Sequence, residues 1–383
     1  MTKWARLLAV LAILAIVAAA CSDSDDDGGE TGATGATTTG TTAATGPTAE
    51  TGGELPGVDF TACEVTDVGG IDDKSFNATA YAGLTQAETE LGVAGSFLES
   101  QTQDDYAPNI QTFIDQGCDL IVTVGFLLGD ATLAAATDNP DQKFAIVDVD
   151  FFDFENSEDI TLDNAKELTF QTDQAAFLAG YLAAGMSQSG TVGTFGGINI
   201  PPVTIFMNGF AAGIAKYNED NGTSVELLGW DAAAQDGTFT GDFENQDNGR
   251  RVTEDFISEG ADIILPVAGP VGLGAAAAAQ DAGNVQLVWV DTDGCIAAAE
   301  YCPLFITSIM KNMNTAVFDQ ISAVVDGSFA GGLYSGTLEN GGVGIAPYHD
   351  FDASVPQELK DAIEGLQAGI IDGSVSVDPA DYA

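Results

Sequence analysis

The sequence predicts an α/β protein in which two lobes are each built on a parallel sheet. From residue 59 onward, short apolar runs alternate with helical patterns, which is typical of βαβ units. The runs LIVTV, KFAIV and QLVWV are nearly continuous in apolar residues, as strands covered by helices on both faces require. One sheet holding every run would be unusually wide, and a second series begins after a long helical segment at 170–188. We therefore expect two doubly wound lobes joined by a hinge.

The predicted elements follow from the change between continuous apolar runs and amphipathic or alanine-rich segments. The expected strands are 62–68, 95–99, 119–124, 143–148, 191–195, 224–229, 262–267, 286–290 and 304–309. The expected helices are 74–91, 106–117, 128–138, 170–188, 203–218, 247–259, 271–282 and 313–326, with a glycine-rich strand (GGVGIA) and a last helix near the end.

The segment 149–169 breaks the alternation and is expected to carry a crossing between the lobes. The first lobe is then predicted to span 56–165, with part of 292–335 returning to it. The second lobe is predicted to span 166–291, with part of 336–383 returning.

The N-terminal residues read as a targeting segment and a tether. Residues 1–21 combine a basic start, an apolar stretch too short for a membrane span, and three alanines before Cys21. Small residues directly before a cysteine are typical of a lipoprotein signal, with Cys21 as the lipidated residue; the alternative is a plain secretory signal with an incidental cysteine. Residues 22–55 are rich in Thr, Gly and Asp, and residues 22–54 lack the large apolar side chains that order a chain, so a disordered tether is expected.

The charge and the cysteines limit the partners and the compartment. The chain has 58 Asp and Glu residues against 10 Lys and Arg, a net charge of −48, which excludes nucleic acid as a partner. Outside the cytoplasm, the four remaining cysteines are expected to form the disulfides Cys63–Cys118 and Cys295–Cys302. A single histidine and the lack of a CxxC pair argue against a zinc site, and we expect no metal or cofactor.

The carboxyl ends of the predicted strands hold aspartates and glycines. In open α/β sheets, ligands bind beyond these ends. The residues there are Asp67, Gly125, Asp148, Gly197, Gly269 and Asp291. Carboxylates accept hydrogen bonds and glycines let a backbone approach a ligand, so a binding cleft is expected, although any one aspartate alone is equally consistent with a helix cap.

Phe76 follows the first of these strand ends, in DVGGIDDKSFN. Asp72 or Asp73 can cap the helix that begins here, which places Phe76 in its first turns, facing the cleft. The alternative is an ordinary core residue. Phe243, in TGDFENQDNGRR, occupies a comparable loop of the second series, so that two rings would clamp a flat ligand.

Five blocks carry a family resemblance: DVGGIDDKSFN, FLAGYLAAGMSQSGTVGTFGG, AGPVGLG with AAQDAG, VWVDTDG and TSIMKNM. In this order they resemble the basic membrane protein family over about residues 60–345. These proteins are lipid-anchored solute-binding components of ABC importers and include purine nucleoside receptors. The resemblance implies a fold like a type I periplasmic binding protein, with two α/β lobes joined by three crossovers, and a permease and an ATPase as partners.

The resemblance also implies which residues hold the ligand. A base would stack between Phe76 and Phe243, with Phe206 or Phe210 as alternatives for the second ring because NIPPVTIFMNGF departs from the family pattern. Asn245 is a second departure, standing where an aspartate is expected.

Polar contacts complete the implied set. Asn77 and Asp67 would bind polar edges, with Asp148 beside them, and Gly269 would approach through its backbone. Asp291 and Lys311 would hold sugar hydroxyls or the base edge, with Lys311 held by Asp291.

The predicted function is therefore capture of a nucleoside-like solute outside the membrane and its delivery to a permease. We expect no enzyme and no catalytic residue, because no GxSxG elbow, HExxH motif or phosphate loop is present. The alternatives are an extracellular nucleoside-processing enzyme and a ligand-sensing surface lipoprotein.

Overall fold

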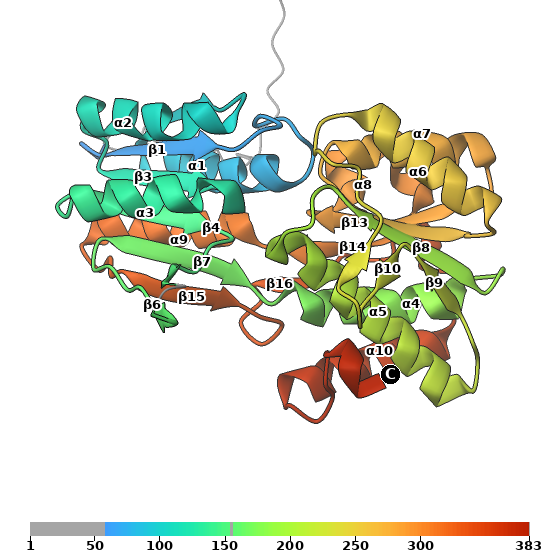
Figure 1. Ribbon diagram of the computed structural model, residues 1–383. Helices are drawn as coiled ribbons and strands as arrows, with labels where there is room; N and C mark the ends of the chain where they lie inside the picture. The colour runs from blue at the N-terminus through green and yellow to red at the C-terminus, as the bar shows by residue number, and fades with distance from the viewer. Residues whose placement is uncertain (1–57, 154–155, 383) are drawn as a thin grey trace, which may run out of the picture. The chain divides into compact units, whose positions relative to one another are not determined.

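The computed structural model describes residues 58–153 and 156–382, within a unit formed by residues 54–383 (Figure 1). The predicted signal peptide 1–21, the tether 22–55 and the lipidation site Cys21 lie outside these residues. Within them, none of the helices combines the length and hydrophobicity that a membrane span needs.

The first sheet has six parallel strands in the order β15-β7-β4-β3-β1-β2. Its strands are β1 (Thr61–Thr66), β2 (Ala94–Glu99), β3 (Leu120–Val124), β4 (Lys143–Val147), β7 (Ala165–Phe170) and β15 (Gly332–Gly336). Four helices cover it: α1 (Phe76–Leu91) and α9 (Met313–Asp326) pack together on one face, and α2 (Tyr106–Gln116) and α3 (Gly129–Asp138) on the other (Figure 1). Every residue of β3 is buried, as a strand covered on both faces requires.

The second sheet has the order β16-β14-β13-β12-β8-β9, with only β16 antiparallel to its neighbour. Its strands are β8 (Thr191–Gly196), β9 (Glu226–Leu228), β12 (Ile263–Val267), β13 (Gln286–Asp291), β14 (Phe305–Lys311) and β16 (Val343–Ile345). Its helices are α4 (Thr172–Met186) and α5 (Pro201–Asn221) on one face, and α6 (Gln246–Ser258) and α7 (Val271–Ala282) on the other, with α10 (Gln357–Ile371) packed on α4.

The remaining elements are short. They are the hairpins β5 (Phe152–Asp153) with β6 (Glu158–Asp159) and β10 (Trp230–Asp231) with β11 (Asp236–Gly237), the helix α8 (Gly294–Ala297), and the 3₁₀ turns η1 (Gln103–Asp105), η2 (Phe126–Leu128), η3 (Ala299–Leu304), η4 (His349–Phe351) and η5 (Pro379–Tyr382).

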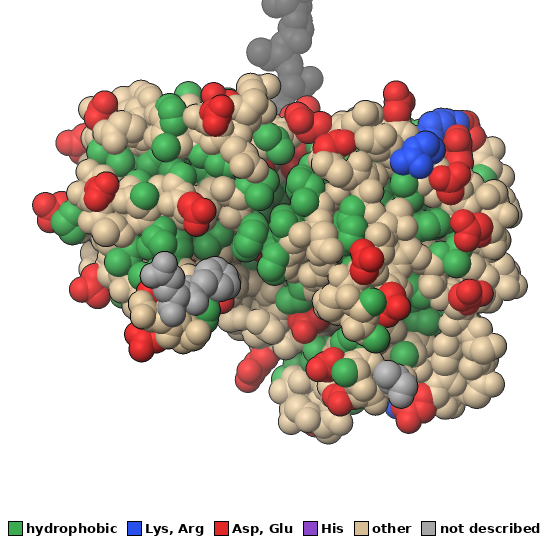
Figure 2. Space-filling view, viewed as in Figure 1, with side chains coloured by type: hydrophobic (Ala, Val, Ile, Leu, Met, Phe, Trp, Pro, Cys, Tyr) green, Lys and Arg blue, Asp and Glu red, His purple; other side chains and the backbone are tan. Residues whose placement is uncertain are grey.

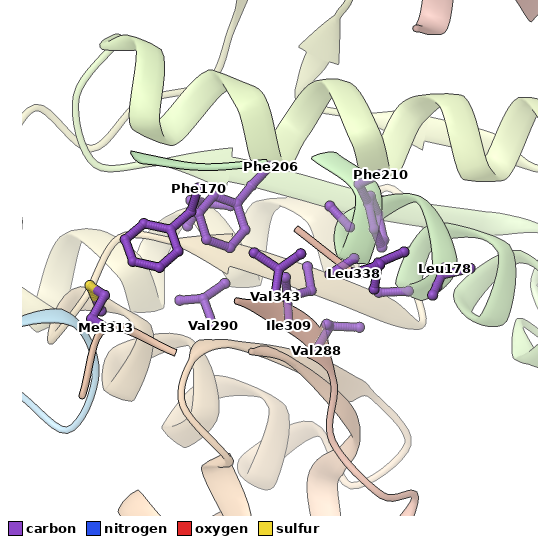
Figure 3. Packing of buried hydrophobic residues seen from close by; sticks show 14 of the residues in the cluster. Phe170, Leu178, Phe206, Phe210, Val288, Val290, Ile309, Met313, Leu338 and Val343 are labelled. Atoms are coloured by element: carbon purple, nitrogen blue, oxygen red, sulfur yellow. The ribbon is translucent and has the colours of Figure 1, made fainter. Parts of the chain in front are cut away.

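One apolar core continues from the first lobe into the second (Figure 3). Phe170 at the end of β7 lies there beside Phe206 of α5. Helices α4 and α5 approach closely because glycines face the neighbouring backbone. A Cβ at Gly180 would overlap the carbonyl of Phe210, and one at Gly213 would overlap that of Phe177.

The chain passes between the sheets three times. It leaves β7 for α4 at Gln171, leaves β14 for α9 at Asn312, and runs from β15 to β16 through 337–342. The crossing expected within 149–169 is wrong, because that segment holds the β5–β6 hairpin and β7 stays in the first sheet. The predicted lobe boundary at 165/166 falls at the start of β7. The sequence of this strand, AKELTF, alternates polar and apolar residues, so it lacks the continuous apolar run by which the other strands were predicted.

The described residues contain two disulfides, one in each lobe. Cys63 of β1 is joined to Cys118, which precedes β3, and Cys295 of α8 is joined to Cys302 in η3. These are the two pairs expected from the sequence.

Candidate functional site

A cavity of about 70 Å³ lies where the carboxyl ends of the strands of both sheets meet. Its walls include all eight residues that the sequence singled out for ligand contact. From the first lobe these are Asp67, Phe76, Asn77 and Asp148, and from the second lobe Phe243, Gly269, Asp291 and Lys311. The structure thus brings together residues that lie up to 244 positions apart, from Asp67 to Lys311 (311 minus 67).

On the first-lobe side, Asp73 fixes the start of α1. Its carboxylate accepts hydrogen bonds from the backbone N–H groups of Ser75 (2.9 Å), Asn77 (2.8 Å) and Ala78 (2.9 Å). This satisfies donors that a helix start leaves free. Of the two candidate caps, Asp73 therefore holds the helix that presents Phe76 and Asn77 to the cavity, whereas Asp72 pairs with Lys74 at the surface.

Asp67 lies at the end of β1 and is buried against Gly125. Asn77 donates from Nδ2 to its Oδ1 at 3.0 Å. Burial raises the pKa of Asp67 to about 8, and the hydrogen bond from Asn77 only partly opposes this. At neutral pH the carboxyl group is therefore largely protonated and can donate as well as accept a hydrogen bond.

Lys311 ends β14 and is only 2% exposed. Its ammonium forms an ion pair with Asp148 at the end of β4, in the other lobe. The ring centroids of Phe76, Phe170 and Phe206 lie 4.9, 5.5 and 5.9 Å from Nζ, within the range of cation–π attraction. The expectation that Asp291 holds Lys311 is wrong, because among the described residues the ammonium pairs with Asp148 instead.

Asp291 is engaged by the loop before α1. Ser75 donates from Oγ to Asp291 Oδ2 at 2.6 Å, and the indole N–H of Trp289 donates to the carbonyl of Lys74 at 3.2 Å. Burial raises the pKa of Asp291 to about 6, although Lys311 and the Ser75 hydroxyl act in the opposite direction. These contacts tie the first lobe to the end of β13.

Asp148 and Asp291 both have positive φ angles, 69° and 68°. This conformation is unusual for residues other than glycine, and it persists where surrounding structure holds it, commonly at binding and catalytic sites. Both strained residues end a strand at the cavity.

Aromatic rings form the apolar walls. Phe76, Phe206 and Phe243 all line the cavity, but Phe210 does not. Phe243 is only partly buried, and its ring lies against Gly197, where a Cβ would overlap it. Gly197, itself one of the predicted strand ends, therefore makes room for this ring.

The sequence reasoning missed Ser75, Phe126 and Pro202. Phe126 and Pro202 line the cavity, and Ser75 contacts Asp291. Phe126 directly follows Gly125 at a strand end, so the same rule would have found it. Pro202 stands at the start of α5, where only the position of that helix brings it to the cavity.

A second cluster, Asp293, Cys295 and His349, has groups close enough to suggest a metal site. Cys295 is bonded to Cys302, which removes its thiolate as a ligand. His349 Nε2 lies 2.7 Å from Asp293 Oδ2, so these two side chains pair with each other.

A family model described as ABC transporter substrate-binding protein PnrA-like, the Bmp family, matches residues 60–378. The chain belongs to this family. Substrate-binding proteins of ABC transporters bind small ligands and deliver them to a permease, which agrees with a cavity between two lobes.

Relatives in the Bmp family and a solved structure agree with this assignment. The "ABC transporter nucleoside-binding protein BmpA" of Lactococcus lactis is 29% identical over 342 residues, covering 83% of this chain and 89% of that protein. "Basic membrane protein A" of Borreliella burgdorferi is 30% identical over 313 residues, covering 81% and 85%. The crystal structure of an ABC solute-binding protein from Aeropyrum pernix has a TM-score of 0.74 at 26% identity, covering 83% and 92%. The two-lobed periplasmic-binding-protein fold is therefore shared.

Proposed function

We propose that this Bmp-family protein captures a purine nucleoside, or a small solute with a similar flat polar ring, and delivers it to the permease of an ABC importer. The observation that carries the proposal is the pairing of aromatic and acidic groups in one cavity. Phe76 and Phe243 come from opposite lobes, and Asp67 and Asp291 lie between the same walls. The Lactococcus lactis relative described as nucleoside-binding supports the same class of ligand.

Each group has a role in this proposal. The rings of Phe76 and Phe243 stack on the two faces of the base, while Asp67 and Asn77 bind its polar edge. Asp291, with Oδ2 occupied by Ser75, offers Oδ1 to a sugar hydroxyl. Lys311 and Asp148 bind the sugar as a pair, and the backbone of Gly269 approaches the ligand. Hydrogen bonds to charged groups contribute about 1.5–3 kcal/mol each, enough to select for such a solute.

The test is to measure, by isothermal titration calorimetry, whether the purified protein binds nucleosides, free bases or ribose. We expect a nucleoside to bind, and Phe76→Ala to weaken it by about 1–3 kcal/mol, or about 5- to 150-fold, with little change in unfolding. Phe243→Ala should do the same. Phe210→Ala, at a fully buried residue outside the cavity, is the matched control, expected to lower stability by about 3–5 kcal/mol and leave affinity per folded molecule unchanged. Large instability with intact affinity in Phe76→Ala would make Phe76 a core residue.

We further propose that Cys21 carries a lipid that holds the protein on the outer face of the cell membrane. The support is the apolar stretch and the alanines before Cys21. Cys21→Ser should release the protein from the membrane or leave its signal peptide uncleaved. In either case, fatty-acid labelling of the variant should be lost. Unchanged labelling of this variant would refute the anchor.

A further inference from the structure

The loop of residues 69–75, between β1 and α1, reaches from the first lobe to the second (Figure 1). Two hydrogen bonds join it to β13. The Ser75 hydroxyl donates to Oδ2 of Asp291 at 2.6 Å, and the indole N–H of Trp289 donates to the carbonyl of Lys74 at 3.2 Å. Asp291 lines the cavity, but Ser75, Lys74 and Trp289 do not. These bonds therefore connect the lobes directly, behind the wall of the cavity.

The first lobe holds this loop in place without help from the second. Asp73 accepts hydrogen bonds from the backbone N–H groups of Ser75 and Ala78, each at 2.9 Å. The Ser75 side chain makes no capping bond to α1. Among the described residues, its hydroxyl contacts only groups of the second lobe, the carbonyl of Val290 and the carboxylate of Asp291. Removing this hydroxyl should therefore leave the first lobe folded.

The backbone of Lys74 gives independent evidence that the loop is held. Its φ angle is 61°, which is unusual for a residue other than glycine and persists where surrounding contacts fix it. The carbonyl of this same residue is the one that accepts the hydrogen bond from Trp289. The strained position thus lies at the point where the loop meets the other lobe.

Charge repulsion opposes the contact between the lobes. The chain has a net charge of −48, and Figure 2 shows acidic side chains on the surface of both lobes. Such an excess of one charge destabilises a compact arrangement through self-repulsion. Specific bonds between the lobes are needed to offset this repulsion, and the two bonds of the loop are of this kind.

We propose that Ser75 is a positioning residue for the binding site: together with the Trp289–Lys74 bond it forms a latch that holds the two lobes together and slows the release of a bound solute. Hinged lobes separate before a solute held between them leaves, and separation breaks both bonds. The bond from Ser75 also fixes Oδ2 of Asp291 at the cavity wall. The effect on nucleoside affinity rests on the proposed function, whereas the latch itself involves no ligand atom.

The first test follows the indole N–H groups by NMR without any ligand. The chain has three tryptophans, Trp4, Trp230 and Trp289, so Trp→Phe variants assign their signals. We expect Ser75→Ala to shift the Trp289 signal and to make its N–H exchange with water at least about threefold faster. The Trp230 signal should not change, because that indole donates to Asn208 within the second lobe, at 3.0 Å.

The second test measures the binding of adenosine by calorimetry and its release by stopped-flow. Ser75→Ala should weaken binding by about tenfold, mainly through faster dissociation, because a hydrogen bond to a charged group is lost. Trp289→Phe should weaken it by about threefold, because a bond between uncharged groups contributes less. Trp230→Phe is the matched control. It removes an equivalent bond within one lobe and should change affinity by less than about twofold.

Ser100→Ala is the matched control for Ser75→Ala. Ser100 also belongs to the first lobe, is 1% exposed and does not line the cavity. Its hydroxyl accepts a hydrogen bond from Nδ2 of Asn109, in the same lobe, at 3.0 Å. This exchange should change neither the Trp289 signal nor the release of adenosine.

Three results would overturn the latch. These are an unchanged Trp289 signal and exchange rate in Ser75→Ala, the same change of that signal in Ser100→Ala, or adenosine release from Ser75→Ala as slow as from the wild type. Failure of adenosine to bind the wild-type protein would instead count against the proposed function. The indole measurement, which needs no ligand, would then decide the latch by itself.

Discussion

Lys311 at the end of β14 and Glu64 in the middle of β1 are both ionisable and almost completely buried, at 2% and 0% exposure. Their surroundings differ. Lys311 pairs with Asp148 of the other lobe and lies close to three aromatic rings. Neither carboxylate oxygen of Glu64 has a hydrogen-bond partner among the described residues, and its strand neighbours are Phe97 and Val122.

The difference shows two ways of burying an ionisable group. Lys311 lies between the lobes, so the opposite sheet can supply a counter-charge at the ligand cavity. Glu64 lies inside one sheet, where burial alone raises its pKa to about 8 and keeps it neutral at neutral pH. Lys311 thus has a counter-charge from the other lobe, whereas Glu64, packed within one lobe, has none and is kept neutral by burial.

Removing Lys311 should have the largest effect. Lys311→Met leaves Asp148 buried without its partner, which we expect to cost about 3–5 kcal/mol of stability at neutral pH, measured by urea unfolding. Asp148→Asn in the same chain should recover much of this loss, because no unpaired charge then remains. A Lys311→Met protein as stable as the wild type would show that the pair is not a buried charge pair in solution.

Removing the disulfides should lower the stability by a different amount for each lobe. Cys63, next to Glu64, is joined to Cys118 across 55 residues, whereas Cys295 and Cys302 are only 7 residues apart. From loop entropy alone, replacing the first pair by serines should cost about 4 kcal/mol and the second about 2 kcal/mol. Unfolding of the two double variants measures this. Peptide mapping without reduction should find both bonds, and four free thiols would contradict the pairing.

Replacing Glu64 should change how stability depends on pH. The folded pKa of about 8 exceeds the ordinary value of 4.5, so between these values the folded state holds a proton that the unfolded state has lost. Stability should therefore fall as pH rises through this window, by up to about 1.4 kcal/mol per pH unit. Glu64→Gln should remove that part of the slope. Glu226→Gln, at an exposed residue of β9, should not change the slope; identical slopes for wild type and Glu64→Gln would refute the protonated state.

Sequence alone was sufficient for much of the fold. Strands β3, β4, β12 and β13 are continuous apolar runs because helices cover both faces of their sheets, and such runs are visible in the sequence. Strands β7 and β15 were missed. Both strands contain polar or glycine residues, and β15 lies at the edge of the sheet. The two strands pair with each other although they lie more than 160 residues apart, and no local sequence pattern reveals such a pairing.

The sequence by itself also identified eight residues that reach the cavity, because the carboxyl ends of parallel strands share one edge and because blocks such as DVGGIDDKSFN resemble a known family. Only the tertiary structure decided their partners. Lys311 pairs with Asp148 rather than Asp291, and the Ser75 hydroxyl donates to Oδ2 of Asp291. Hydrogen bonds and ion pairs act over a few ångströms, so they depend on how the two lobes are placed against each other, and that placement results from packing over the whole chain.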